Sequence, residues 1–295
     1  MSLSDKDIQA LELKANSIRQ DIINMLVEAG SGHSAGPLGM ADVFSALFFS
    51  LLHVDPKKPN WELRDRVVLS NGHICPVLYA TMAEAGFFPK SELMKLRKFG
   101  SRLQGHPHRT ALPGLETTSG PLGSGLSQAA GMALAGKMDD DPWRVYCLTS
   151  DGEHDEGNTW EAVMFAAKYK LDNLTAIMDR NNIQIDGYTE DVMPLENLRA
   201  KYEAFGWYVI EIDGHNMRQI VDAVEQSKTI HGKPTMILAH TIPGKGVDFM
   251  ENDFKWHGAP PGGIEDDDGP PKEKQAEAAL KELRTLRGKI KSEHE

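Results

Sequence analysis

Cysteine, long apolar runs and excess positive charge are all scarce in this chain of 295 residues. Only Cys75 and Cys147 occur, far apart and in apolar surroundings, which excludes a disulfide framework and a thiolate zinc site and fits a reducing cytoplasm. The most apolar run, Val43–Val54, is too short to span a bilayer. The first 14 residues, MSLSDKDIQALELK, are polar and periodic and do not have the pattern of a signal peptide. We therefore expect a cytoplasmic protein without a membrane partner.

The charge balance is acidic, with 32 Lys and Arg against 43 Asp and Glu and a formal net charge of −11. Proteins that coat nucleic acids or anionic membranes need basic surface, so we expect neither as a partner. Apolar residues make up 40% of the chain and charged residues 25%, which is ordinary for a globular protein. A chain of this length can bury a large core without disulfides or structural metals.

Hydrophobic periodicity indicates alternating helices and strands. Apolar residues recur every three or four positions from Ile8 to Leu26, behind the capping residue Ser4, and predict a first helix that ends at Gly30. Further helices are expected at 40–52, 73–85, 159–169, 195–205 and 217–230, and strands at 66–70, 144–149, 174–178, 207–212 and 235–239. This alternation implies βαβ units. We predict an α/β fold, a three-layer, doubly wound, mostly parallel sheet with helices on both faces.

Two long loops and a charged tail complete the predicted organisation. The loops at 100–123 and 241–271 exceed the usual length, which is typical of functional or disordered segments. Residues 272–295 return to a helical, highly charged pattern that favours a solvated surface helix. We therefore divide the chain into one domain at 1–271 and a charged C-terminal helix at 272–295.

Polar residues directly follow two of the predicted strands. Asp151 follows the strand at 144–149, and Asn181 follows the next one. Ligands in parallel sheets bind beyond the carboxyl ends of the strands, and carboxylate and amide oxygens suit Mg²⁺ or Ca²⁺. Gly152 and Gly157 leave room for a phosphate at the start of the following helix. Alternatively, Asp151 caps a turn and Asn181 adopts a left-handed conformation, but the pairing across strand ends favours a metal–diphosphate site.

Four histidines lie beside glycines or at element ends, namely His33, His73, His106 and His257. Glycines allow close approach of a ligand to the backbone, so this setting favours polar binding and proton transfer. The histidine spacing matches no zinc helix, and we do not expect them to bind metal. The segment 119–125, SGPLGSG, is compatible with a simple hinge or with a wall that presents backbone atoms to a flat ring.

These same residues carry a resemblance to a known family. The runs, in family order, are SGHSAGPLGMAD (31–42), LSNGH (69–73), QGHP (104–107), ETTSGPLGSGLSQAAGMAL (116–134), SDGEHDEGNTWEA (150–162), DRNNIQIDG (179–187) and WHGAPP (256–261). Together they resemble the N-terminal half of transketolase, a thiamine-diphosphate enzyme. The resemblance implies that residues 1–271 form the diphosphate-binding domain of such an enzyme.

The resemblance also implies roles for individual residues. Metal ligands would be Asp151, Asn181 and the carbonyl of Ile183, for Mg²⁺ or Ca²⁺. Cofactor contacts would come from Asn71, Gly72, His73, Gly120, Leu122, Gly152 and His257. The histidines around the reacting carbon and the sugar hydroxyls would be His33, His106 and His257. Glu156 would join an acidic relay between cofactor sites across the dimer interface and so contribute to both catalysis and cofactor binding.

The chain departs from the family pattern at two places. Ser150 stands where the family usually has glycine, so we expect the backbone packing there to differ. His108 and Arg109 follow the His-Pro of the substrate loop, where a glutamate is usual. This extra positive charge could suit the anionic end of a substrate or could have no role.

The family's pyrimidine-binding domain has no counterpart in this sequence. The resemblance therefore implies one subunit of a split transketolase, active only with a C-terminal partner subunit, in an α₂β₂ heterotetramer. The implied reaction transfers a two-carbon ketol unit from a ketose phosphate to an aldose phosphate. Rival interpretations are a dihydroxyacetone or deoxyxylulose-phosphate synthase, a transketolase for unusual sugars, and a non-catalytic regulatory homologue. Retention of Asp151, Asn181 and the histidines argues against the last.

Overall fold

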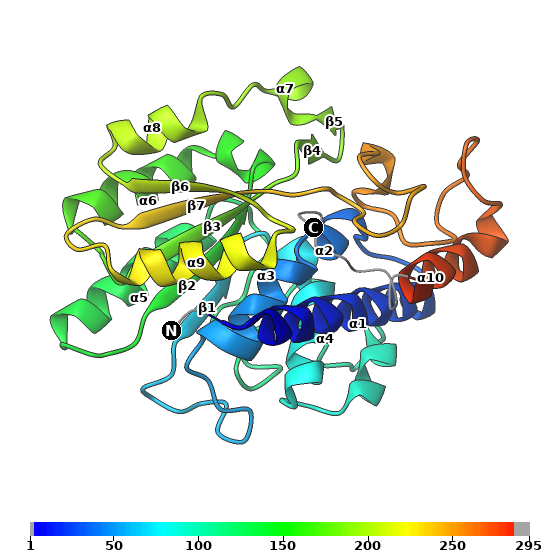
Figure 1. The fold of residues 1–295 in the computed structure, drawn as a ribbon, viewed down its shortest axis with the longest axis horizontal. Helices are drawn as coiled ribbons and strands as arrows, with labels where there is room; N and C mark the ends of the chain where they lie inside the picture. Colours follow the sequence, from blue (N-terminus) through cyan, green and yellow to red (C-terminus); the bar gives the residue numbers. More distant parts are fainter. Residues whose placement is uncertain (1–2, 286–295) are drawn as a thin grey trace.

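A five-stranded parallel sheet forms the centre of the molecule in a computed structural model that describes residues 3–285 (Figure 1). Its strands, in spatial order, are β1 (Arg66–Leu69), β2 (Val145–Ser150), β3 (Leu174–Arg180), β7 (Thr235–His240) and β6 (Tyr208–Asp213). Each neighbouring pair is parallel. The predicted strands and their direction are confirmed, with bounds that differ by one or two residues.

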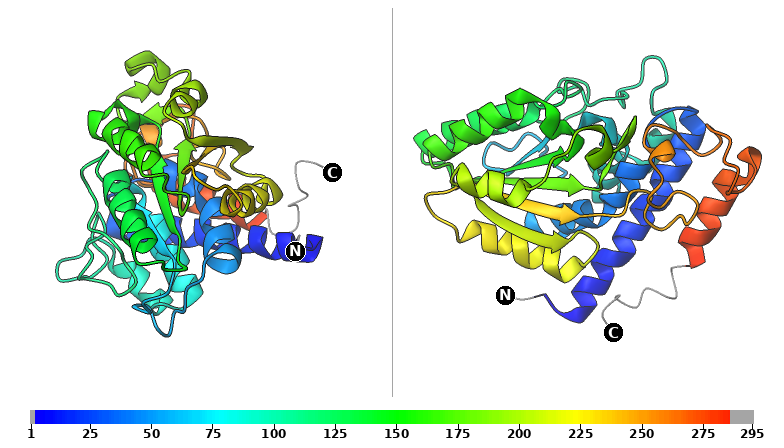
Figure 2. Two further views of the ribbon diagram at one scale, coloured as in Figure 1. Left: turned by 90° about the vertical axis from the view of Figure 1, so that its left-hand side faces the viewer. Right: turned by 90° about the horizontal axis from the view of Figure 1, so that it is seen from above.

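Helices cover both faces of the sheet, which confirms the predicted three layers (Figure 2). One face packs against α1 (Asp5–Ala29), α3 (Ala41–Ala46), α4 (Cys75–Ala85) and α9 (Met217–Lys228). The other packs against α5 (Gly125–Met138), α6 (Gly157–Lys168) and α8 (Leu198–Ala204). Strand residues alternate between the two cores, as Tyr146 and Leu148 show on one side and Val145 and Cys147 on the other.

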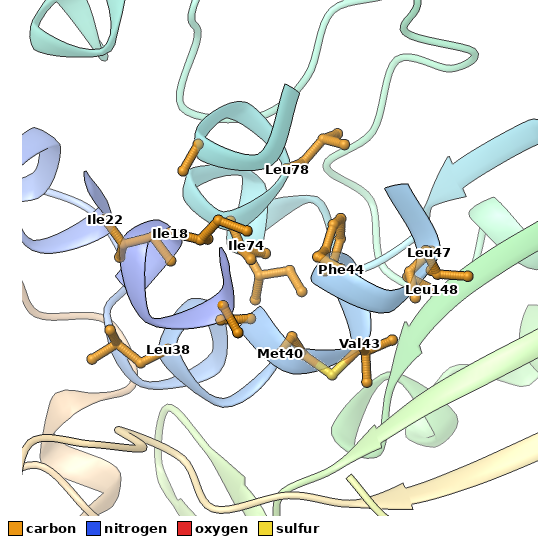
Figure 3. Close-up of a cluster of buried hydrophobic side chains, with 14 of the residues drawn as sticks. Ile18, Ile22, Leu38, Met40, Val43, Phe44, Leu47, Ile74, Leu78 and Leu148 are labelled. Carbon is orange, nitrogen blue, oxygen red and sulfur yellow. The ribbon is translucent and has the colours of Figure 1, made fainter. Parts of the chain in front are cut away.

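The first helix is bounded as its sequence predicts. Ser4 and Asp7 form a capping box at its start, and Gly30 ends it in the left-handed conformation at φ 65°. Its apolar stripe meets α3 and α4, where Ile18, Phe44 and Leu78 pack into one cluster (Figure 3). Full burial of such a side chain contributes about 1.5–3 kcal/mol to folding.

Two predicted helices differ from the structure. The single helix expected at 40–52 is instead α3 followed by a π turn at Leu47–Leu51, where the amide of Leu52 bonds the carbonyl of Leu47 at 2.9 Å. The reason is that this stretch is apolar at nearly every position and so carries no clear period. The expected solvated tail helix is α10 (Gln275–Thr285), and its one face, carrying Gln275, Ala279 and Leu283, is buried against the domain. Residues 286–295 of that expectation lie outside the described residues.

The remaining elements are short. They are α2 (Ala35–Gly39), β4 (Ile183–Gln184), β5 (Gly187–Tyr188), α7 (Thr189–Val192) and single turns at Gly72–Ile74, Lys90–Lys95, Gly152–Asp155, Phe254–Trp256 and Lys272–Lys274. Strands β4 and β5 form a small antiparallel hairpin. No helix within residues 3–285 is long and apolar enough to cross a membrane.

Candidate active site

Four strands lead into segments that carry predicted site residues: His73 follows β1, Asp151 follows β2, Asn181 follows β3 and His257 lies after β7. The remaining predicted histidines come from other segments, His33 from the one between α1 and α2 and His106 from the loop before α5. Ser150, at the end of β2, lies opposite Asp179 of β3, and Arg180 lies opposite His240 of β7. This register places the loop that begins at Asp151 beside the one that begins at Asn181. The sequence argument that parallel strands bring these loops together is confirmed.

Asp151 connects the two loops directly. Its Oδ2 atom accepts the amide hydrogen of Asn182 at 2.7 Å, and its Oδ1 atom accepts that of Gly152 at 2.7 Å. Asn181 turns its Oδ1 atom toward the amide of Ile183 at 3.1 Å. The left-handed residue of this turn is Asn182, at φ 64°, rather than Asn181. Asp151 therefore caps its own turn, as the alternative interpretation held, and also lies beside the second loop.

Two buried ionisable residues of this site have no counterpart in the sequence prediction. The guanidinium of Arg180 donates to Asp151 at 3.1 Å and to Thr189 at 2.9 Å, and it pairs with Glu190 and Glu196. The carboxylate of Asp179 accepts hydrogen bonds from Thr241 and from Asn181. Their only sequence signal is charge at the end of an otherwise apolar strand.

Burial raises the pKa values of the two carboxyl groups in this region, Asp151 and Asp179. It raises the pKa of Asp151 to about 6, although Arg180 and two backbone amides lower it in part. The pKa of Asp179 rises to about 7, first through burial and then through the nearby charge of Asp151. The guanidinium of Arg180 pairs with Asp151, whereas the Asp179 carboxyl contacts only the neutral groups of Thr241 and Asn181 among its hydrogen-bond partners in the described part of the chain. A divalent cation beside them would favour the ionised forms of both carboxyl groups. The hard oxygen donors of Asp151, Asn181 and Ile183 fit Mg²⁺ or Ca²⁺, whereas no cluster of three or more His, Cys, Asp or Glu residues in 3–285 could hold a metal.

Three of the four predicted histidines form one cluster. The ring centroids of His33, His73 and His257 lie 4.8, 5.2 and 5.4 Å apart. Burial lowers the pKa of His33 and of His257 to about 4 and that of His73 well below its ordinary value. All three are therefore neutral at pH 7 and able to exchange a proton with a bound ligand.

His106 borders this cluster on the side of the glycine-rich segment. A Cβ atom at Gly120 would lie 3.9 Å from the His106 ring. Burial lowers the pKa of His106, and the nearby charge of Arg97 lowers it further. The structure thus places the histidine of the 100–123 loop next to Gly120.

Buried polar atoms without partners surround the same space. Among the described residues, no group bonds the side-chain amide of Asn71, the hydroxyl of Ser119, or the Nδ1 atoms of His33 and His257. A Cβ atom at Gly72 would lie 2.5 Å from the Ser119 hydroxyl, so only glycine allows these loops to approach this closely. Unsatisfied buried polar atoms are costly, and a polar ligand between these loops would bond them.

Glu153 holds the glycine-rich segment in place and was missed by the sequence analysis. Its carboxylate accepts the Ser70 hydroxyl and the amide of Gly123, the latter at 2.7 Å, and also the amide of Ser150 at 3.1 Å. One buried side chain therefore joins the ends of β1 and β2 to the turn before α5. This arrangement favours a wall presenting backbone atoms over a free hinge.

The remaining predicted residues lie at the surface or pack without strain. Glu156 is exposed at the start of α6, and Leu122 is exposed at the turn before α5. His108 and Arg109 are exposed. Ser150 ends β2 with an ordinary strand backbone, so replacement of the usual glycine requires no special conformation. The bond to Glu153 is made by the backbone amide of Ser150, which glycine would also provide, so it assigns no packing difference to the serine side chain.

Fold and site together define an α/β domain with a candidate oxygen-donor site at the strand ends and a cluster of buried histidines beside it. Comparison with known proteins specifies the family. The family described as "Transketolase, thiamine diphosphate binding domain" matches residues 11–269. The chain belongs to the transketolase family, whose members use thiamine diphosphate with a divalent metal ion.

Two relatives are transketolase subunits of about this length. One is the 6-deoxy-6-sulfo-D-fructose transketolase subunit of Clostridium sp. (strain MSTE9), which is 47% identical over 255 residues that cover 86% of this chain and 92% of the relative. The other is one of the subunits of the apulose-4-phosphate transketolase of Phocaeicola vulgatus, which is 40% identical over 287 residues that cover 97% of this chain and 98% of the relative.

Single-chain transketolases are much longer. Human transketolase is 42% identical over 259 residues, 86% of this chain but 40% of that protein. The crystal structure of Campylobacter jejuni transketolase superposes with a TM-score of 0.85 at 35% identity, covering 95% of this chain and 43% of the other. The chain thus spans about two fifths of these single-chain relatives.

Proposed function

We propose that this chain is the N-terminal, diphosphate-binding subunit of a two-subunit transketolase. The observation that carries the proposal is the match itself: the chain aligns with 92% and 98% of two proteins that are named as transketolase subunits. The reaction would transfer a two-carbon ketol unit from a ketose phosphate to an aldose phosphate. Thiamine diphosphate supplies the carbon–carbon chemistry when bound, and the protein supplies orientation and proton transfer.

The metal and the diphosphate would bind at the ends of β2 and β3. The metal ligands would be Asp151, Asn181 and the carbonyl of Ile183. The raised pKa values of the buried Asp151 and Asp179 carboxyl groups support a cation there, because a cation would stabilise their charged forms. Gly152 would let the diphosphate approach the backbone. Other cofactor contacts would come from His73, Gly120, Leu122, Glu156 and His257, with the unpartnered Asn71 amide beside them.

Proton transfer would fall to His33, His106 and His257. The first and last have lowered pKa values near 4 and unpartnered Nδ1 atoms, so each can accept a proton from a substrate hydroxyl. His106 lies beside Gly120, on the approach from the substrate loop. These three groups would orient the sugar hydroxyls while the reacting bond breaks and forms.

We place the partner on the outer face of α5 and α6. These helices lie side by side (Figure 1), and their outer face carries exposed Met138, Met164, Phe165 and Tyr169. The Phe165 and Tyr169 rings contact at 4.6 Å, so the patch is continuous along α6. Apolar patches of this kind mark protein interfaces. Glu156 is the N-cap residue of α6, and we expect it to lie at the edge of this interface.

Reconstitution tests the proposal. The chain alone should show no ketol transfer, and the purified C-terminal subunit should restore it and yield a mass near that of two copies of each. Phe165→Asp should weaken this association by about 30-fold or more, since loss of a central apolar contact costs about 2 kcal/mol or more. Leu13→Asp, at an exposed position of α1 on the opposite layer, is the matched control. Activity in the chain alone would refute the two-subunit proposal.

The donor sugar is the finer question. The relatives' names specify a sulfonated fructose and a phosphorylated apulose, so an anionic end is common to both substrates. The exposed pair His108 and Arg109 would face that end. A panel of phosphorylated and sulfonated ketoses, assayed with the reconstituted enzyme, distinguishes an ordinary transketolase from one for unusual sugars. Failure of every donor, with cofactor bound, would favour the non-catalytic interpretation.

A further inference from the structure

Ser34 connects the two loops that carry His33 and His257. Its Oγ atom lies 2.7 Å from the carbonyl oxygen of Ala259 and 3.1 Å from that of Trp256, more than 220 positions along the chain. A hydroxyl has one hydrogen, so the two carbonyls share it. These carbonyls lie on either side of His257, and Ser34 directly follows His33. One buried side chain therefore joins the backbone next to His33 to the backbone on both sides of His257.

The bond is not the one that this position ordinarily makes. Ser34 is the N-cap residue of α2, and a serine there usually accepts a hydrogen bond from the backbone of its own helix. Here no such bond forms, and the side chain reaches the distant loop instead. Local helix formation thus does not explain this serine.

The two loops are in close contact at this point. A Cβ atom at Gly258 would lie 3.8 Å from the Nε2 atom of His33. The rings of His33 and His257 meet edge to face, 5.4 Å apart. The amide of Gly244 also bonds the carbonyl of Ala35 at 2.9 Å, so the backbone after His33 is held from two sides. Within this frame, Ser34 adds a side-chain bond directly beside the histidine pair.

We propose that Ser34 is a positioning residue that sets the separation and dehydration of the His33–His257 pair. Without its hydroxyl, the Trp256 and Ala259 carbonyls lose their donor and take water, which opens the space between the loops. The two imidazoles then become better hydrated and less well aligned for proton transfer. The catalytic part of this inference rests on the proposed transketolase function, whereas the geometric part does not.

The first test uses the isolated chain and needs no activity. Histidine-labelled protein is titrated by NMR, and Ser34→Ala should raise the pKa of both His33 and His257 by about 1, because hydration favours the charged imidazole. The groups that face His33 are His73, His106, His257 and Arg97. His106 is an internal control and should change least, since the hydrogen bonds of the Ser34 hydroxyl go to the segment around His257 and not to the loop of His106.

Ser45→Ala is the matched control variant. Ser45 is also fully buried and also donates to one carbonyl, that of Leu11 at 2.7 Å, but it joins α3 to α1 away from the histidines. It should leave the pKa of His33 and His257 unchanged. If Ser34→Ala does not fold, Ser34→Gly carries the same test, because glycine is tolerated at an N-cap. Unchanged histidine pKa values in the Ser34 variants, or equal changes with Ser45→Ala, would overturn the proposal.

The second test uses the reconstituted two-subunit enzyme. Ser34→Ala should lower kcat about tenfold and move the acid limb of the pH–rate profile upward, with the Kd for thiamine diphosphate changed less than about twofold. An equal loss of cofactor affinity would overturn the catalytic part, since it would indicate a general structural defect. If the wild-type pair is inactive while the NMR shifts occur, the proposed function fails and the geometric role of Ser34 stands.

Discussion

The buried contact between Arg180 and Asp151 allows a quantitative test of the site. Their side chains are only 4% and 1% exposed, whereas the Glu190 and Glu196 side chains that Arg180 also contacts are 41% and 53% exposed. Water screens the last two pairs, so the bond to Asp151 dominates the contribution of Arg180. Removing one partner of a buried pair costs about 3–5 kcal/mol when the other must stay charged.

Asp151 can escape part of that penalty by taking up a proton. Its pKa is already about 6, and loss of the neighbouring guanidinium raises it further. We therefore expect Arg180→Met to lower the free energy of unfolding by about 2–3 kcal/mol at pH 7, somewhat less than the cost of leaving a buried charge unpaired. Urea unfolding followed by tryptophan fluorescence, without cofactor or metal, measures this value.

A matched control and a double variant complete the test. Arg199 also pairs with two glutamates but is 40% exposed, so Arg199→Met should cost less than about 1 kcal/mol. With Asp151→Asn in the background, Arg180→Met should cost at least about 1 kcal/mol less, because the orphaned charge is gone. Equal costs for the two arginine variants, or strict additivity in the double variant, would refute the reasoning.

Three further predictions concern the ligand site and its histidines. At 100 times the Kd for the metal–cofactor pair the wild-type chain should gain about 2.7 kcal/mol of stability, and Asp151→Asn should lose most of that gain in the same unfolding assay. Gly72→Ala forces a Cβ atom to within 2.5 Å of the Ser119 hydroxyl and should weaken cofactor binding about tenfold by calorimetry, whereas Gly131→Ala, with no atom within 4 Å, should not. His257 has a folded pKa near 4, below its ordinary value, so its contribution to stability is present above about pH 6.5 and is lost as the pH falls toward 4. His257→Gln should reduce this loss of stability at acid pH by about 3 kcal/mol. An unchanged pH dependence of the free energy of unfolding would contradict the prediction.

His106→Ala separates substrate contact from cofactor contact. If His106 orients the sugar, as the family resemblance implies, its loss should weaken donor use more than cofactor binding. Donor KM and kcat in the reconstituted enzyme, with the Kd of thiamine diphosphate measured alongside, provide the comparison. Equal losses in both would count against a substrate role.

Local sequence was a reliable guide where one force dominates. The apolar stripe from Ile8 to Leu26, the cap at Ser4 and the stop at Gly30 all reappear in α1. The strands were predictable because short β-branched runs between helical patterns favour the extended conformation over a helix. Their carboxyl-end loops then placed Asp151 beside the Asn181 turn by topology alone.

Prediction was weakest where tertiary contacts override composition. The uniformly apolar stretch at 40–52 gave no signal for the π turn. The charged pattern of the tail likewise did not predict the buried face formed by Gln275, Ala279 and Leu283. In α10 the charges lie on the outer face, and only contact with α1 shows that the helix docks; the Asn16 side chain bonds the carbonyl of Leu283 at 3.0 Å.

By itself the sequence determined the order of the elements, the parallel sheet and the identity of the ligand-bearing loops, because these follow from periodicity and from motifs of adjacent residues. Only the tertiary structure decided which distant groups meet. Arg180 on Asp151, Glu153 on the turn before α5 and Ser34 on the His257 loop all join residues whose spacing carries no signal. The physical reason is that burial sets their protonation and their bonds, and burial is a property of the packed chain.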